Sequence, residues 1–307
     1  MPGALERTDF ISMNIENLFP GAGGGEPARV AVFMSGAGTN AAALIEYERT
    51  HPGVCFRVVL LVTDAPETSR VHMLAERYGL PVAALDIRRY YAERGEPAIA
   101  LITPRRRELR AAWTEELRGL IHPYRIDFGV LAGFVPLCNI TADYPCLNVH
   151  PGDLAVEENG RRILAGLHFR PVETAILAGR PALRSSVILA RPFQGGGEAD
   201  MDTGPVLGVS PELPVDLEGV TLEELRRIHA RRGRAPFRDR LREIASANLE
   251  RLKTEGDHVV LPRAVADFAA GRFGIGPDGV LCYRRNGFWM EVKTVEYSLR
   301  GEVPLLP

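Results

Sequence analysis

The stretch RVAVFMSGAGTN, residues 29–40, decides the fold of this chain. It opens with a short apolar run that ends in Ser-Gly, which is typical of a buried strand that enters a tight turn. The residues that follow, about 40–48, have the pattern of a helix. A strand, a glycine-rich turn and a helix in this order predict the first unit of a parallel sheet.

The same alternation continues through the first half of the chain. Apolar runs over residues 56–63, 81–87 and 126–131 predict further strands, and helices are expected over residues 69–78 and 106–121. Strands that alternate with helices indicate an α/β fold with right-handed crossovers. We therefore expect a Rossmann-like, mainly parallel twisted sheet with helices on both faces.

The second half of the chain has a less regular pattern. Strand-like runs occur over residues 146–149, 185–190 and 205–209, and a strongly charged helical region is expected over residues 222–252. A last helix is expected to begin at Pro262.

Near the C-terminus, Asp278-Gly279 and Asn286-Gly287 separate short β-prone runs, which is the signal for a terminal hairpin or meander. A glycine-rich joint ends the first segment of the chain. The expected parts are a flexible N-terminal leader over residues 1–28, a core over residues 29–212, and a C-terminal helical and β-hairpin extension over residues 213–307 that packs on the core.

The composition is that of an ordinary globular protein. The chain has 307 residues, of which 46% are hydrophobic and 25% are charged, and its formal net charge is −2. This balance gives no reason to expect a nucleic-acid or membrane partner, no apolar run is long enough to span a bilayer, and no signal peptide is expected. The cysteines lack C-x-x-C spacing, which favours free thiols in a reducing compartment. These features predict a cytoplasmic protein.

The turn SGAGTN, residues 35–40, is suited to an anion. Glycines let the backbone approach a ligand, and the start of the next helix offers unpaired N–H groups and the positive end of the helix dipole. We expect the phosphate of a small substrate to bind here. The candidate phosphate-binding residues are Ser35, Gly36, Gly38, Thr39 and Asn40.

Two other interpretations of this turn stay open. It could be a tight strand-to-helix turn without a ligand. It could also bind a dinucleotide, because Gly36-x-Gly38-x-x-Ala41 fits the G-x-G-x-x-G/A pattern and Asp64 ends the second strand, where a ribose-binding acid is expected. The dinucleotide interpretation would make the chain an NAD(P)-binding oxidoreductase.

A second motif combines LNVHP, residues 147–151, with MDTGP, residues 201–205. On a strand, residues i and i+2 point to the same face, so Asn148 and His150 should project together at the carboxyl edge of the sheet. The turn that contains Asp202 could return a carboxylate to the same edge. An amide, an imidazole and a carboxylate suffice to move an acyl group onto an amine without a metal or a covalent intermediate.

Each of these side chains also has a purely structural interpretation. His150 could cap the end of a strand, Asn148 could bond a neighbouring backbone amide, and Asp202 could form an Asx turn with its own backbone. The chemical interpretation depends on whether the three side chains meet beside the glycine turn.

Together, the motifs resemble those of the folate-dependent formyltransferase family, and most closely its phosphoribosylglycinamide formyltransferase branch. The resemblance spans about residues 29–285. The matching segments are residues 35–40 for S-G-x-G-[ST]-N, residues 132–134 for A-G-F, Asn148 and His150 for N-x-H-P, Asp202 for D-x-G-P, and residues 257–262 for the E-H-x-x-x-P helix.

The resemblance implies a formyltransferase fold and transfer of a formyl group from the cosubstrate 10-formyltetrahydrofolate to the primary amine of a small phosphorylated acceptor. Glycinamide ribonucleotide is the lead acceptor, which would place the reaction in purine biosynthesis. Asn148 would hydrogen-bond the formyl oxygen, His150 would handle protons, and Asp202 would hold His150. No metal is implied, and a homodimer is allowed.

The resemblance also assigns the two substrate sides. Asp257 would join the glycine turn on the acceptor side. The candidate folate-binding residues are Leu131, Gly133, Phe134, Val135 and Leu137.

Several segments depart from the family pattern. GDLA, residues 152–155, follows His150-Pro151 where the family has S-L-L-P, and residues 135–137 replace an arginine-containing continuation. Gly195–Gly197 resembles an insertion, and Asp257 is shorter than the family's glutamate. These differences leave open another amine acceptor such as an amino sugar nucleotide, hydrolysis of 10-formyltetrahydrofolate, or a catalytically weak relative that only binds a ligand.

Arginines crowd residues 226–242, among several acidic residues. A solvated helical face, a clamp for an anionic substrate tail and an RNA contact all stay open for this segment. The scarcity of aromatic side chains there disfavours stacking on RNA bases.

Overall fold

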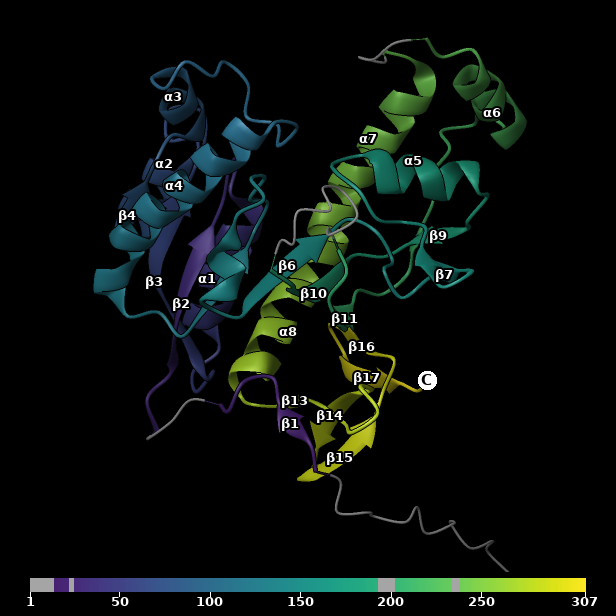
Figure 1. The fold of residues 1–307 in the computed structure, drawn as a ribbon. Coiled ribbons are helices and arrows are strands. Elements are labelled where there is room, and N and C mark those ends of the chain that lie inside the picture. Colours follow the sequence, from purple (N-terminus) through teal and green to yellow (C-terminus); the bar gives the residue numbers. More distant parts are fainter. Residues whose placement is uncertain (1–13, 22–24, 193–201, 234–237) are drawn as a thin grey trace, which may run out of the picture.

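The computed structural model describes residues 14–21, 25–192, 202–233 and 238–307 (Figure 1). Its centre is a nine-stranded mixed sheet. From one edge to the other, the strands are β17 (Gly301–Leu305), β16 (Thr294–Ser298), β11 (Val206–Val209), β10 (Ser186–Ala190), β6 (Cys146–His150), β5 (Phe128–Leu131), β2 (Ala28–Phe33), β3 (Phe56–Thr63) and β4 (Val82–Ala84).

The half of the sheet that contains β2 is parallel. β2 pairs in parallel with β3 and β5, β3 pairs with β4, and β5 pairs with β6. β10 is antiparallel to both β6 and β11, and β17 is antiparallel to β16. The expected α/β fold is thus confirmed, and its parallel half provides the carboxyl edge at which such sheets bind ligands.

Helices cover both faces of the sheet, as the alternation predicted. Along β2, Val30 and Val32 pack in one apolar cluster with α1, α2 and α8, whereas Ala31 and Phe33 pack in another with α3 and α4. The helices are α1 (Thr39–Thr50), α2 (Val71–Tyr78), α3 (Ile87–Ala92), α4 (Pro104–Ile121), α5 (Arg170–Leu177), α6 (Leu222–Ala230), α7 (Arg240–Leu252) and α8 (His258–Ala269).

A continuous helical segment runs through the C-terminal extension. Helices α5, α6 and α7 share their own apolar cluster, and α7 runs through a π-helical turn, Lys253–Asp257, into α8. The last helix therefore begins before Pro262, which lies inside α8. Because α8 packs against α1 and β11, the extension is anchored on the core.

A four-stranded antiparallel sheet lies beyond α8, and it contains the expected hairpin. The turn that follows β14 has φ angles of 51° at Asn286 and 86° at Gly287, the left-handed conformation that Asn-Gly favours in two-residue hairpin turns. The strands of this sheet are β1 (Glu16–Asn17), β13 (Phe273–Ile275), β14 (Leu281–Arg285) and β15 (Phe288–Glu291). Two short pairs complete the strands, β7 (Glu157–Glu158) with β8 (Arg161–Arg162), and β9 (Ala182–Leu183) with β12 (Leu213–Pro214).

Part of the N-terminal segment packs against the body. β1 pairs with β13, and Phe19 is only 8% exposed. The Phe19 ring stacks on Phe268 with centroids 5.3 Å apart and meets Phe128 edge-on at 5.4 Å. Residues 14–21 of the expected flexible leader are thus held in place, whereas residues 1–13 and 22–24 lie outside the described ranges.

Replacing Phe19 by Leu is expected to lower the free energy of unfolding by about 1–3 kcal/mol, because each of the two aromatic pairs contributes ~0.5–1.5 kcal/mol. The midpoint of urea unfolding measures this change. Leu299→Ala, at a side chain that is 81% exposed, is the control and should change the free energy by less than about 0.5 kcal/mol. Equal effects of the two substitutions would contradict the packing of Phe19.

The arginine-rich segment has partners on α5 and at the start of α7. The side chain of Arg232 is 8% exposed, and its guanidinium donates to Glu173 at 2.7 Å and to Asp239 at 2.7 Å. The hydrogen bond that Arg232 donates to Asp239 holds the pKa of the Asp239 carboxyl below its usual value. Arg226 donates to the carbonyl oxygen of Leu177 at 3.0 Å. These arginines therefore fasten α5 and α6 to the start of α7.

Some residues that the motifs singled out, namely Gly195–Gly197, Met201 and Arg234, lie outside the described ranges. Within those ranges, no helix has both the length and the apolar character needed to cross a membrane.

Candidate active site

A cavity of about 550 Å³ opens at the carboxyl ends of β2, β5 and β6. Residues 35–40 form one wall, residues 131–138 form another, and residues 148–151 and 166–168 lie between them, with Asp202 beside them. The volume is in the range of small-molecule sites. The C-terminal extension contributes Leu249, Lys253 and Asp257.

His150 and Asp202 meet in this cavity. His150 is 4% exposed, and its Nδ1 lies 3.4 Å from Asp202 Oδ2. The other ring nitrogen, Nε2, lies 2.7 Å from the backbone oxygen of Leu164. Because a carbonyl oxygen only accepts, Nε2 is the ring nitrogen that carries a proton, and Nδ1 together with the Asp202 carboxylate has room for one more. The pair is therefore arranged to hold one exchangeable proton.

The backbone around Asp202 turns its carboxylate towards His150. Asp202 has a φ angle of 57°, in the left-handed region that Asp and Asn tolerate better than most residues. The Gly166 N–H donates to Asp202 Oδ2 at 3.2 Å, and the Arg162 guanidinium donates to the Asp202 backbone oxygen. Both the side chain and the backbone of Asp202 are thus anchored.

Asn148 lies two residues before His150 on β6 and lines the same cavity. Its side chain makes no hydrogen bond to another residue of the described ranges. None of the described residues therefore competes with a ligand for this amide. The structure brings Asn148, His150 and Asp202 to one cavity, and their catalytic roles stay predictions.

A second carboxylate reaches the cavity from the C-terminal extension. Asp257 is 4% exposed, and it accepts hydrogen bonds from Asn40 Nδ2 at 2.9 Å and from Ser185 Oγ at 2.5 Å. Burial raises the pKa of Asp257 above its usual value. The π-helical turn carries Asp257 inwards, and it needs Gly256 because a Cβ atom there would lie 2.7 Å from Ser185 Oγ.

The glycine turn offers both donors and an acceptor. Thr39 and Asn40 begin α1, so the unpaired N–H groups and the positive dipole end of this helix lie at the cavity. Asn40 Oδ1 is buried and has no hydrogen-bond partner among the described residues, which suits a donor on a ligand. Gly38 has a φ angle of 70°, and a Cβ atom there would lie 2.5 Å from Leu74 Cδ1. By contrast, a Cβ atom at Gly36 would meet open space.

The Ser35 hydroxyl is hydrogen-bonded within the protein, and the expected phosphate contact of Ser35 stays a prediction. Its hydroxyl donates to Asp64 Oδ1 at 2.5 Å and accepts from the Val135 N–H at 3.0 Å. Asp64 is 6% exposed and does not line the cavity, and burial raises its pKa. The hydroxyl of Ser35 therefore braces the glycine turn and links it to Asp64 and to the segment after β5.

Solved structures share this arrangement of elements, although no protein-family model and no curated protein matches the sequence. The phosphoribosylglycinamide formyltransferase of Coxiella burnetii is similar, with a TM-score of 0.56 and 19% identity, covering 89% of this chain and 100% of that one. The phosphoribosylglycinamide formyltransferase of Anaplasma phagocytophilum has a TM-score of 0.54 and 18% identity, covering 88% and 99%. Glycinamide ribonucleotide transformylase 1 of Symbiobacterium toebii has a TM-score of 0.51 and 24% identity, covering 83% and 92%.

This chain has the formyltransferase fold. The resemblance that the motifs indicated is therefore confirmed at the level of the fold.

In this formyltransferase fold, the segment after β5 forms the wall on which folate-binding residues were expected. Arg110 supports that wall from behind. Its buried guanidinium donates to the backbone oxygens of Leu137 at 2.5 Å and Ile99 at 2.7 Å. Arg110 belongs to none of the motifs, so its contact with this wall could not be predicted from the sequence. The expected residues that line the cavity are Leu131, Gly133, Phe134, Val135 and Leu137.

Lys253 was also missed. It lines the cavity four residues before Asp257 on the same helical segment, and it pairs with Glu250 at 2.5 Å. The i, i+4 spacing would have indicated a shared face, but both residues fell between the expected helical region over residues 222–252 and the helix expected to begin at Pro262. In the part of the chain that the structure describes, no group of three or more His, Cys, Asp or Glu side chains could hold a metal ion.

Replacing Asp257 by Asn is expected to stabilise the protein at neutral pH. Because burial raises the folded-state pKa of Asp257, its contribution to stability is complete below the pKa of an unfolded aspartate, about 3.9, and is lost as the pH rises through the raised value. Asn does not ionise, so the urea midpoint of the variant should exceed that of the wild type by a margin that grows from about pH 4 towards neutrality.

Unfolding curves of both proteins across this pH range test the expectation. Asp278→Asn, at an exposed turn, is the matched control and should track the wild type. If the urea midpoints of Asp257→Asn and the wild type differ by the same amount at every pH, ionisation of Asp257 does not oppose folding.

Proposed function

We propose that this chain transfers the formyl group of 10-formyltetrahydrofolate to the primary amine of a small phosphorylated acceptor, with glycinamide ribonucleotide as the lead candidate. The observation that carries the proposal is the His150–Asp202 pair, which shares one cavity with Asn148 and the glycine turn. The fold supports it, because the solved structures that resemble this chain are named as formyltransferases. A cytoplasmic location and a place in purine biosynthesis belong to the proposal.

The chemistry requires stabilisation of charge. As the amine attacks the formyl carbon, a carbon–nitrogen bond forms and the formyl oxygen gains negative charge. The side-chain N–H of Asn148 would donate to that oxygen, since Asn148 has no hydrogen bond to another described residue.

The chemistry also requires movement of one proton. The His150–Asp202 pair would take the proton that the attacking amine loses, and would return it to the folate nitrogen as the bond from that nitrogen to the formyl carbon breaks. The products are then a formylated amine and tetrahydrofolate, with no net change in protons. Holding both substrates in register supplies further acceleration.

The acceptor would be held by the glycine turn and the C-terminal extension. Its phosphate would lie at the start of α1, where the Thr39 and Asn40 N–H groups and the Lys253 ammonium supply positive charge. Its hydroxyl and amide N–H groups would donate to Asp257 and to Asn40 Oδ1, which lacks a described partner. The apolar wall after β5 would take the folate ring system.

The decisive experiment mixes the purified chain with 10-formyltetrahydrofolate and glycinamide ribonucleotide, detects the formylated product by mass spectrometry, and titrates each ligand and NADH by calorimetry. We expect product, and a single-turnover rate that falls about 10²–10³-fold in Asn148→Ala. Asn17→Ala, at an exposed residue of β1, is the matched control. Formate without formylated product would instead indicate hydrolysis, and NADH binding without folate binding would overturn the proposal.

A further inference from the structure

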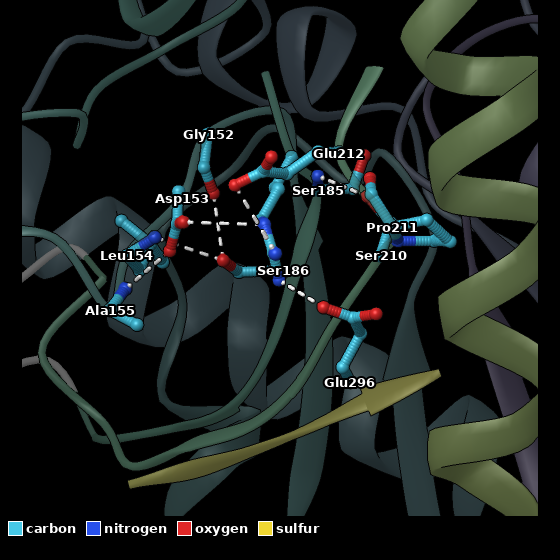
Figure 2. Close-up of polar contacts among 11 residues, drawn as sticks. Gly152, Asp153, Leu154, Ala155, Ser185, Ser186, Ser210, Pro211, Glu212 and Glu296 are labelled. Carbon is cyan, nitrogen blue, oxygen red and sulfur yellow. Dashed lines mark hydrogen bonds and ion pairs between the residues drawn. The ribbon is translucent and has the colours of Figure 1, made fainter. Parts of the chain in front are cut away.

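The turn that follows His150 is held by buried contacts on several sides (Figure 2). Its residues, 152–154, replace the family's S-L-L pattern with G-D-L. The turn leads into the segment that returns to the cavity at residues 166–168. What fastens this turn therefore bears on where the His150 ring lies.

Ser186 fastens the turn from the neighbouring strand. It is fully buried on β10, directly opposite His150 in the β6–β10 ladder. Its hydroxyl donates to the Gly152 backbone oxygen at 2.8 Å and accepts from the Leu154 N–H at 2.9 Å, as Figure 2 shows. A single side chain thus bridges both ends of the turn.

Asp153 is held by hydrogen bonding and by charge. Its Oδ1 accepts from the Ala155 N–H at 3.0 Å. Its Oδ2 lies 3.9 Å from Arg184, whose guanidinium also pairs with Glu212 at 3.4 Å and Glu296 at 2.8 Å. Because Glu296 belongs to β16, this network ties the middle of the turn to the central sheet.

Gly152 leaves room for the backbone oxygen that holds His150. A Cβ atom at residue 152 would lie 2.4 Å from the Leu164 oxygen and 2.9 Å from His150 Nε2. Those two atoms are themselves 2.7 Å apart. Since Gly152 does not have a left-handed backbone, its missing side chain, and not its conformation, is what the position requires.

We propose that Gly152, by admitting the Leu164 carbonyl, acts as a positioning residue for His150 in the formyl transfer proposed above. The Leu164 oxygen keeps a proton on Nε2 and fixes the plane of the ring. Nδ1, which faces Asp202, is then the one ring nitrogen that exchanges a proton with the reacting groups. Ser186 secures the turn that keeps Gly152 in place.

If Gly152 and Ser186 position the His150 ring, their replacement should change kcat and KM differently. Neither Gly152 nor Ser186 lines the central cavity, so their replacement should leave substrate binding intact. A misplaced or wrongly protonated His150 ring would instead slow the reaction of bound substrates. The KM values should therefore stay constant while kcat falls.

The test combines kinetics with imidazole NMR on the full chain. We expect Gly152→Ala to lower kcat about 10²-fold with unchanged KM values for both substrates. In the wild type, a hydrogen-bonded Nε2–H resonance, assigned by its loss in His150→Gln, should be present, and Gly152→Ala should remove it. Ser186→Ala creates no clash. It should also lower kcat and weaken the Nε2–H resonance, but by less than Gly152→Ala does. This variant replaces Gly152→Ala in the test if Gly152→Ala does not fold.

Gly119→Ala is the matched control, because Gly119 is exposed on α4 and a Cβ atom there meets no atom within 4 Å. A retained Nε2–H resonance in Gly152→Ala, or a lower kcat without a change in that resonance, would overturn the proposal. If the wild type transfers no formyl group, the proposed function fails, whereas the resonance in the two variants still decides whether Gly152 positions His150.

Discussion

Replacing Asp202 by Asn is expected to lower the single-turnover rate of formyl transfer about 10²–10⁴-fold, the range for loss of a general acid–base group. Asn tolerates the left-handed φ of 57° at this position, so the backbone should be kept. The amide oxygen can still accept from the Gly166 N–H, and the amide nitrogen would then face His150 Nδ1. With a donor on that side and the Leu164 oxygen on the other, the His150 ring has no place for a second proton.

A rapid-quench measurement of product formed on the enzyme reports this step. The matched control is Asp86→Asn, because Asp86 caps α3 by accepting from the Arg89 N–H and Asn caps helices equally well. The control should keep the wild-type rate. If Asp202→Asn folds and also keeps that rate, the Asp202 carboxylate takes no part in proton transfer.

The parts of the fold that depend on local pattern could be predicted from the sequence. The apolar run before residues 35–40 formed β2, and the glycine turn begins α1. Asn148 and His150 lie together because the side-chain period of a strand is two, a rule that needs no knowledge of distant residues. Asp202 reached the same cavity, as its turn before a further strand suggested.

The parts that depend on distant partners could not be predicted in this way. Phe19 lies in a segment whose glycine-rich end resembled a flexible joint, but its ring is held by Phe128 and Phe268, which are more than a hundred residues away. His150 Nε2 contacts the backbone oxygen of Leu164. Every residue has such an oxygen, so the sequence does not indicate which one makes this contact. Pro262 looked like a helix start, but the helix continues through it from the π-helical turn.

Replacing Gly204 by Ala is expected to lower the free energy of unfolding by about 4 kcal/mol or more, one of the largest effects of any single substitution. A Cβ atom at residue 204 would lie 1.7 Å from the Leu189 backbone oxygen and 2.8 Å from the Leu189 carbonyl carbon. Leu189 belongs to β10, which is paired on both sides with β6 and β11. The clash therefore involves backbone that cannot move without breaking the ladder.

Urea unfolding measures the loss, and Gly119→Ala gives a control of opposite sign, since alanine at an exposed helical position stabilises by roughly 0.5–1 kcal/mol. If Gly204→Ala remains folded, the strain must be relieved by movement of the turn that contains Asp202, and the Asp202–His150 contact of 3.4 Å would lengthen. Such a variant should lose formyl transfer together with stability. An unchanged urea midpoint would mean that this turn can leave β10 freely, and the close approach at Gly204 would then not be what holds Asp202 beside His150.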